Sequence, residues 1–336
     1  MKRTLWLLIG CVLFFSSCRW DVGAWWSDDA EKEESRIFRY DRLMDEFVSL
    51  NSFSALQRMN TEFPTPTRLL IEDVLGIGLV EDAHIEQHLR DYFLDSTMQV
   101  LLQDVHLEYS DLTAEEKELS SVFSQVKKTD PDFKIPFIYA QISGLNQSIV
   151  VGDSILGISL DKYLGLDYPL YKKYYHGYQR QMMDRSRLVP DAAFYYLSHT
   201  YPLEEGKGHT LLDFIVDYGK MHWVIAQCRH VSLEEEAGFT KERADWCHKH
   251  EARLWRWLQD RHALAGNDSA VVAAFMLPCT EQAVKEKKSA NQIGLWFGLQ
   301  IVDCYMKSHP ELSVGELLRR QDYGTILRES GYNPVK

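Results

Sequence analysis

Apolar residues recur at helical spacing along most of the chain beyond residue 36, a pattern typical of a mainly helical protein. The longest continuous pattern in the N-terminal half covers residues 82–105 and predicts one long amphipathic helix. Thr113, with Glu116 three residues later, has the signature of a capping box. It predicts that another helix begins there and continues to about Lys128.

Residues 135–160 have a different pattern, rich in β-branched and aromatic residues and interrupted by Gly144, Asn146 and the turn triplet at 152–154. This pattern predicts three short antiparallel strands. Because residues 149–151 are consecutive apolar positions, we expect the small sheet to be covered on both faces.

The chain after these strands again predicts helices. Thr240 is expected to cap a helix that continues to about His262, and Ser313 with Glu316 forms a capping box near the C-terminus. Together the elements predict an α+β fold over residues 36–336. It is a predominantly helical single domain with a small antiparallel β-sheet in its middle.

Two of the predicted C-terminal helices have apolar patterns that indicate which of their faces are buried. Residues 293–306 are apolar nearly all round and predict a central buried helix, whose Gly294 and Gly298 allow another backbone to approach closely. The other helix has one apolar stripe, formed by Leu211, Phe214, Ile215, Tyr218, Met221, His222 and Ile225. Asp213, Asp217 and Lys220 lie opposite this stripe. The two aspartates could bind a cation, but the nearby Lys220 favours a solvated face.

The N-terminus has the features of a bacterial lipoprotein signal. A basic pair precedes an apolar run at residues 5–15, which is too short for a permanent membrane span and typical of a secretory signal. Two serines then precede Cys18, as in a lipobox, where the cysteine is acylated after residues 1–17 are removed. An ordinary signal peptide followed by a chance cysteine is the alternative. Residues 18–35 are acidic and predict a flexible tether.

We therefore expect the mature protein to be anchored by lipid on Cys18, without a transmembrane helix. Arg19 is not the Asp associated with retention in the inner membrane, which favours the outer membrane. We expect the anchor in its periplasmic leaflet, although residue 19 does not distinguish this from the cell surface. The chain of 336 residues has a formal net charge of −12 and no evident cluster of Lys and Arg. These features argue against a surface for nucleic acid or for an anionic membrane.

Four cysteines remain once Cys11 is removed and Cys18 is acylated. They are irregularly spaced in apolar, helical segments, so buried free thiols are expected rather than disulfides. These cysteines are Cys228, Cys247, Cys279 and Cys304.

His84 and His88 are four residues apart with Glu86 between them, which is close to the zinc-protease pattern H-E-x-x-H. In that pattern the glutamate follows the first histidine directly, about 100° round the helix. Glu86 is about 200° round and points to the opposite side. We therefore expect a solvated pair of histidines and predict neither a metal site nor a cofactor.

Glu251 occupies a core-facing position of the helix that follows Thr240. A buried carboxylate needs a partner or a shifted pKa. Its candidate partners are His248 on the same helix and Tyr218, Lys220 and His222 on the preceding one. One interpretation makes this cluster a binding or acid/base site in a cleft. The other, which we favour, makes Glu251 a paired structural carboxylate that fixes the helix register.

Four segments together resemble the gliding-motility lipoprotein B family (GldB) of the Bacteroidetes. They are IVVGDSILGISLDKYLGLDYP (149–169), LLDFIVDYGKMHW (211–223), ADWCHKHEARLW (244–255) and IGLWFGLQIVDCYM (293–306). The hairpin followed by L-x-x-Y-L-G is the most specific part. The resemblance implies a lipid-anchored envelope protein, associated with gliding and its secretion machinery, and it assigns no chemical reaction.

A more distant similarity is to predicted zinc peptidases of the gluzincin type. Their H-E-x-x-H helix would correspond to residues 188–202, which contain no such motif. Tyr218 stands where those enzymes have a ligand glutamate. This similarity implies a scaffold kept for binding, so we expect a non-catalytic component with envelope protein partners. The rival interpretations are a divergent metallohydrolase or acid/base enzyme using Glu251, and a glycan-binding lipoprotein.

Overall fold

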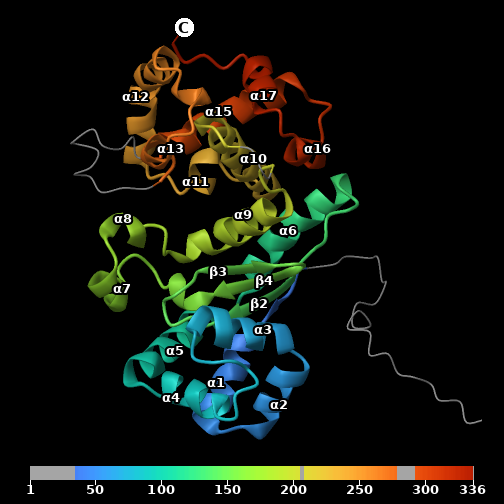
Figure 1. Ribbon diagram of the computed structural model, residues 1–336, viewed down its shortest axis with the longest axis vertical. Coiled ribbons are helices and arrows are strands. Elements are labelled where there is room, and N and C mark those ends of the chain that lie inside the picture. The colour runs from blue at the N-terminus through green and yellow to red at the C-terminus, as the bar shows by residue number, and fades with distance from the viewer. Residues whose placement is uncertain (1–34, 205–207, 278–291, 336) are drawn as a thin grey trace, which may run out of the picture. The chain divides into compact units, whose positions relative to one another are not determined.

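The computed structural model describes residues 35–204, 208–277 and 292–335, which belong to one compact unit. The predicted signal peptide, Cys18 and nearly all of the predicted tether lie outside the described residues, as does Cys279. The fold is a mainly helical α+β domain with a small sheet (Figure 1). The predicted fold class is therefore confirmed.

The sheet is mixed rather than antiparallel. Its strands are β1 (Ile37–Phe38), β2 (Phe137–Gln141), β3 (Ile149–Gly152) and β4 (Ile155–Ser159), in the order β1-β2-β4-β3. β3 and β4 form the predicted hairpin, whereas β2 is parallel to both β1 and β4. The tight turn at Asp153 and Ser154 forces β3 and β4 to be antiparallel neighbours. The longer loop between β2 and β3 places β3 at the edge of the sheet. The hairpin then brings β4 back between β3 and β2, where it is parallel to β2.

Helices cover both faces of this sheet, as the apolar strand pattern predicted. Helix α1 packs against β2 on one face, and α9 packs against β3 and β4 on the other (Figure 1). The side chains of Ile138, Leu156 and Ile158 are buried between these layers. The sheet is therefore a central layer of the core, which explains why its strands lack polar alternation.

The N-terminal helices differ from the predicted ones in two places. They are α1 (Tyr40–Leu50), α2 (Phe53–Thr61), α3 (Pro64–Arg68), a π-helical segment (Leu69–Leu75), α4 (Ile85–Phe93), α5 (Ser96–Glu108) and α6 (Thr113–Thr129). The segment 82–105, predicted as one helix, is split into α4 and α5 because Asp95 caps α5 by accepting hydrogen bonds from two backbone N–H groups. Helix α6 has the predicted extent, but Thr113 is already helical and the predicted capping box does not form.

The C-terminal helices confirm most of the predicted caps. They are α7 (Pro169–Tyr174), α8 (Gly177–Arg180), α9 (Leu188–Thr200), α10 (Leu211–Arg229), α11 (Leu233–Glu236), α12 (Lys241–Asp260), α13 (Ser269–Met276), α15 (Ile293–Ser308), α16 (Val314–Arg319) and α17 (Tyr323–Ser330). Thr240 caps α12, and Ser313 with Glu316 forms the predicted capping box of α16. Thr210 caps α10 in the same way, with Asp213.

Helices α10 and α15 cross with their backbones in contact. A Cβ atom added to Gly219 would overlap the backbone of Gly298, and one added to Gly298 would overlap the carbonyl oxygen of Ile215. The close approach predicted for Gly298 is therefore confirmed, and its partner is the glycine in the middle of α10. Helix α15 is buried along most of its length, also as predicted.

Two of the cysteines are buried free thiols, as expected. Cys228 and Cys247 are buried and unbonded, and burial raises the pKa of each thiol to about 12. Cys304 is also a free thiol but is only half-buried. Within the described ranges, no helix combines the length and the apolar character that crossing a membrane requires.

The crossing gives a first testable prediction. Gly219→Ala should lower the free energy of unfolding by about 1–3 kcal/mol, because the added methyl group must push α10 and α15 apart. Urea denaturation monitored by circular dichroism measures this change. Gly177→Ala is the matched control, since a Cβ atom there meets only the end of the Arg180 side chain at 3.9 Å. Equal stabilities of the two variants would contradict the backbone contact.

Candidate functional site

The family-like segment after β4 forms a buried polar turn. Asp161 is fully buried, and its carboxylate accepts hydrogen bonds from the backbone N–H groups of Ser143 (2.9 Å) and Leu145 (2.7 Å). Burial raises the pKa of Asp161, and these hydrogen bonds oppose that rise. Lys162 donates to the Leu145 carbonyl (3.0 Å) and to the Tyr175 hydroxyl (2.9 Å). The turn therefore ties the end of β4 to the loop that follows β2.

Tyr163 extends this turn to helix α9. Its hydroxyl donates to the Asp191 carboxylate (3.1 Å), whose other oxygen accepts from Arg187 at 3.2 Å. Arg187 is buried and also donates to the backbone carbonyl of Glu236 in α11. Burial raises the pKa of Asp191, while the Arg187 guanidinium opposes the rise.

Glu236 is the centre of a second group of contacts. Its fully buried carboxylate lies 3.1 Å from Nδ1 of His222 and accepts a hydrogen bond from Arg229 at 2.6 Å. Arg229 also donates to Glu118 of α6 at 2.6 Å. Phe194 of α9 stacks on the His222 ring, with centroids 4.7 Å apart and planes at 12°.

We call Arg187, Asp191, His222, Arg229 and Glu236 the α9–α11 ion network. Each carboxylate in it has both oxygens engaged by partners from the described chain. Buried charges of this kind are stable only when they are paired. Removal of one partner leaves the remaining charge unpaired in the low-dielectric interior, which destabilises the fold. The network therefore fixes α9, α10 and α11 against each other.

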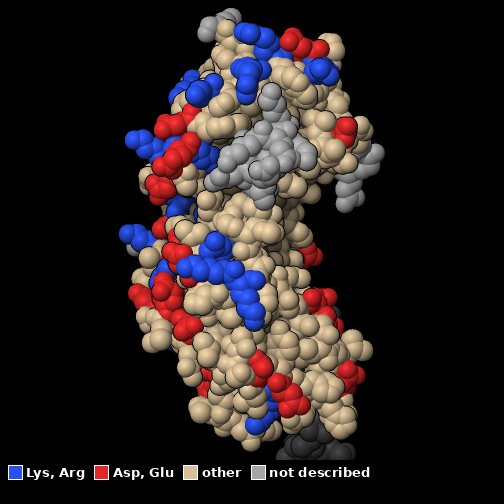
Figure 2. Space-filling view, turned by 90° about the vertical axis from the view of Figure 1, so that its left-hand side faces the viewer, with Lys and Arg blue, Asp and Glu red and all other residues tan. Residues whose placement is uncertain are grey.

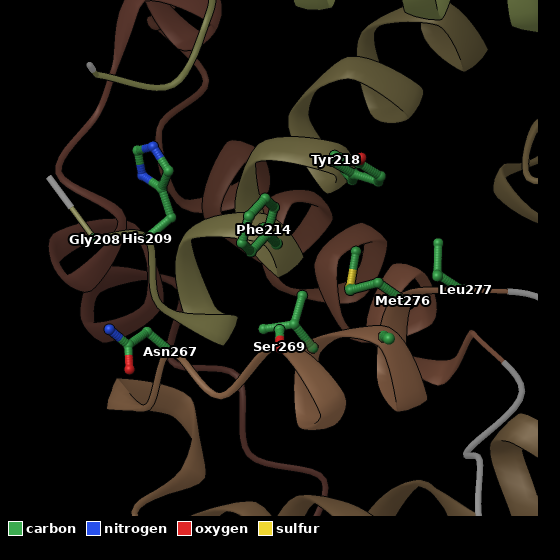
Figure 3. A pocket seen from close by; sticks show the side chains of 10 residues that line it. Gly208, His209, Phe214, Tyr218, Asn267, Ser269, Met276 and Leu277 are labelled. Carbon is green, nitrogen blue, oxygen red and sulfur yellow. The ribbon is translucent and has the colours of Figure 1, made fainter. Parts of the chain in front are cut away.

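Tyr218 lies beside this network and faces an open apolar pocket between α10 and α13 (Figure 3). The pocket has a volume of about 410 Å³ and is lined by Gly208, His209, Phe214, Tyr218, Asn267, Ser269, Val272, Ala273, Met276 and Leu277. The Tyr218 ring contacts Phe194 at a centroid distance of 5.0 Å. The lining is mainly apolar, and its few polar groups do not define how a ligand would be oriented.

Asp217 and Lys220 are buried, so the solvated face predicted for them is wrong. Lys220 lies 3.1 Å from the Asp217 carboxylate, and Tyr323 donates a hydrogen bond to the same group at 3.0 Å. Burial lowers the pKa of Lys220, and Asp217 opposes this change. Lys220 also donates to backbone carbonyls at Leu318 and Arg320. The C-terminal helices α16 and α17 cover this face of α10, which the local pattern does not reveal.

The predicted cluster around Glu251 forms only in part. Glu251 is half-buried and accepts hydrogen bonds from Trp296 (3.2 Å) and Tyr332 (2.8 Å), which the sequence did not indicate as partners. His248 lies 3.8 Å from it but is mostly exposed. The other predicted members, Tyr218, Lys220 and His222, bind the partners described above. Glu251 thus has the contacts of a structural carboxylate that joins α12, α15 and the C-terminal segment.

His84 and His88 are both exposed, as expected for a solvated pair. Helix α4 begins only at Ile85, so His84 is its N-terminal flanking residue. In the part of the chain that the structure describes, no three His, Cys, Asp or Glu side chains are grouped closely enough to hold a metal ion.

Sequence reasoning identified His222 but missed its partners. Asp191, the partner of Arg187 and Tyr163, could have been detected, because it is the one acidic residue in an apolar helical segment. Glu236 was not detectable, since it ends a run of three glutamates that resembles a solvated turn. The Arg187 side chain likewise gives no local indication that α11 covers it.

The fold and this site define a mainly helical α+β domain whose central charged groups are paired inside the core. The family model described as gliding motility protein GldB matches residues 26–334, nearly the whole chain. The chain therefore belongs to the GldB family, which makes it a gliding-motility-associated protein of a lipoprotein family and confirms the resemblance. Searches of curated proteins and of solved structures found no match.

The ion network gives a second prediction. Glu236→Gln should lower the free energy of unfolding by about 1–3 kcal/mol, because the buried Arg229 then keeps only the half-buried Glu118 as its counter-charge and His222 loses its carboxylate partner. The neighbouring Glu235 is exposed, so Glu235→Gln is a matched control with an expected change within about 0.5 kcal/mol. Chemical denaturation of both variants tests the difference, and similar midpoints would show that the network contributes little to stability.

Proposed function

We propose that this protein is anchored by lipid on Cys18 to the periplasmic leaflet of the outer membrane. There it binds other envelope proteins of the gliding or secretion machinery as a non-catalytic component. Membership of the gliding motility protein GldB family supports the cellular role. The N-terminal sequence, with its short apolar run and two serines before Cys18, supports the anchor.

The non-catalytic part of the proposal is supported by the contacts of three carboxylates, because each is hydrogen-bonded or ion-paired to other side chains of the described residues. A general base must be free to take a proton from a substrate. Glu236 instead lies between Arg229 and His222, and Asp191 lies between Arg187 and Tyr163. Glu251, the residue on which an acid/base mechanism would depend, accepts hydrogen bonds from Trp296 and Tyr332. These contacts favour a structural role for all three carboxylates.

The described tryptophans give less support to glycan binding. A stacking surface for sugars requires exposed aromatic faces, whereas Trp255 and Trp296 are buried and Trp223 and Trp246 are half-buried. Trp257 is 39% exposed. One exposed tryptophan among the described residues offers a small stacking area, so protein partners remain the favoured ligands.

The anchor gives a third prediction. Cys18→Ala should release the protein from membranes into the soluble fraction, because the acylated sulfur is lost. Cys11→Ala is the matched control: it removes a cysteine from the segment that is expected to be cleaved, so membrane association should persist. Fractionation and mass spectrometry of the N-terminal peptide measure the result. Membrane retention of the Cys18 variant together with an unmodified Cys18 in the natural protein would refute the anchor.

The binding role is tested by crosslinking in intact envelopes, followed by identification of the captured proteins. The proposal expects the same envelope proteins to be recovered repeatedly with the natural chain and to be lost with Cys18→Ala. Metal analysis of the purified protein is the complementary measurement. Stoichiometric zinc would favour the hydrolase interpretation and contradict a non-catalytic component.

A further inference from the structure

Strand β3 forms one edge of the sheet and has β4 as its neighbour on one side only (Figure 1). In an antiparallel pair, directly opposite residues alternate between those that exchange backbone hydrogen bonds and those that do not. Ser159 donates its backbone N–H to the carbonyl of Ser148, which lies opposite it, so Val150 is the next residue to bond to β4. The backbone N–H and C=O groups of Ile149 and Val151 therefore point away from β4, towards the edge of the sheet.

These edge groups have no partners among the described residues. Apart from the pairing with β4, no hydrogen bond of the described chain involves Ile149 or Val151. The opposite edge of the sheet differs, because α6 supplies a side chain to it. Glu116 of α6 accepts a hydrogen bond from the N–H of Ile37 in β1 at 2.8 Å. The fold thus satisfies one edge with a side chain and leaves backbone donors and acceptors along the other.

The side chains of β3 do not block this edge. Proteins commonly protect an exposed edge with charged side chains, prolines or bulges. Residues 147–152 have the sequence QSIVVG, which contains no charge and no proline, and the register with β4 has no bulge. Ile149 and Val151 are half-buried, whereas Ile158 and Leu156, which lie opposite them in β4, are fully buried. Apolar surface therefore remains along the edge.

Helix α9 packs against β3 and adds an exposed aromatic ring beside the hairpin. Nε2 of His199 in α9 lies 3.8 Å from the carboxylate of Asp153 in the β3–β4 turn. Tyr195, one helical turn earlier on the same side of α9, is 51% exposed. Tyrosine is enriched in protein–protein interfaces, where its ring buries a large area.

The surface charge gives no comparable indication of a partner. On the side of the molecule shown in Figure 2, Lys and Arg side chains are interspersed with Asp and Glu, so neither sign of charge selects a ligand there. The edge of β3 instead presents N–H donors and C=O acceptors at the spacing of a strand. An extended polypeptide backbone carries the complementary groups at the same spacing.

We propose that the edge of β3 binds an extended segment of an envelope protein as an additional strand of the sheet. The segment pairs with the backbone groups of Ile149 and Val151, and its alternate side chains lie on the side of the sheet that α9 covers. The inference rests on the binding role proposed above. It adds the mode of binding, in which the partner contributes a strand to this sheet.

A strand-forming peptide tests the edge directly, with the mature chain carrying Cys18→Ala. The probe is a short fluorescent peptide of consecutive valines flanked by threonine and lysine, and its binding should raise the fluorescence anisotropy. The same peptide N-methylated at every valine should not bind, because it lacks the backbone N–H donors of a strand. Absence of binding by the unmodified peptide would overturn the proposal, as would equal binding of the two peptides.

Val151→Pro removes an edge N–H from the protein itself. The N–H of Val151 takes no part in the pairing with β4, and proline is tolerated at such positions of edge strands. The affinity for the unmodified peptide should fall roughly ten-fold or more, because a donor is lost and the ring obstructs the edge. Val151→Thr is the matched control, since it keeps the N–H and the β-branched shape and should bind as the natural residue does.

Circular dichroism establishes that both variants are folded. If Val151→Pro folds poorly, Ile149→Pro removes the other edge N–H and gives the same comparison. Equal affinities of a folded proline variant and the threonine variant would refute pairing at this edge.

Crosslinking in intact envelopes separates the mode of binding from the binding role. The envelope proteins captured by the natural chain should be lost with Val151→Pro and kept with Val151→Thr. Capture of the same proteins by folded Val151→Pro would leave the binding role in place and overturn strand addition. Failure of the natural chain to capture any protein would count against the binding role, while the peptide measurement still decides whether the edge accepts a strand.

A second copy of the chain is the other occupant that an unpaired edge could accept. Sedimentation of the mature chain carrying Cys18→Ala distinguishes this case, and a monomer is expected. If the chain is a dimer that Val151→Pro converts to a monomer, the edge joins two copies and the proposal is wrong.

Discussion

Helices α10 and α15 cross at Gly219 and Gly298 with no side chain between them. This contact brings two backbones together along the centre of the C-terminal helices, and both helices are therefore buried over much of their length. A methyl group at either glycine would separate them, and every contact arranged around α10 would shift. The position of the buried charges on α10 depends on this crossing.

Helix α10 presents charged groups to two different neighbours. On one side His222 reaches Glu236, and on another Lys220 pairs with Asp217 beneath the C-terminal helices. His222 joins α10 to α11, whereas Lys220 and Asp217 join α10 to the C-terminal helices through the Leu318 carbonyl and the Tyr323 hydroxyl. The signature turn at Asp161 makes a comparable connection between the sheet and the loop after β2. The domain is thus held together by short polar contacts between distant segments, in addition to its apolar core.

This organisation bears on what the protein does. Buried charged groups such as Glu236 and Lys220 contact groups from other segments and serve the fold. The proposed binding of envelope proteins requires a rigid body. The buried ion pairs supply the rigidity.

The sequence by itself determined the features that depend on neighbouring residues. Thr240 and Ser313 cap their helices, the β3–β4 turn forms a hairpin, and α15 is buried with Gly298 in close contact, all as predicted. These features follow from hydrogen bonds and periodicities within a few residues, so local patterns are sufficient to find them.

Only the tertiary structure decided which charges are buried and which strands are parallel. Lys220 was predicted to be solvated, but α16 and α17 cover it. Glu251 accepts hydrogen bonds from Trp296 and Tyr332, and His222 is not among its partners. The parallel pairing of β2 with β4 likewise depends on where a loop leads the chain. Burial and pairing are set by segments far apart in the sequence, and no local pattern records which distant segment will cover a given face.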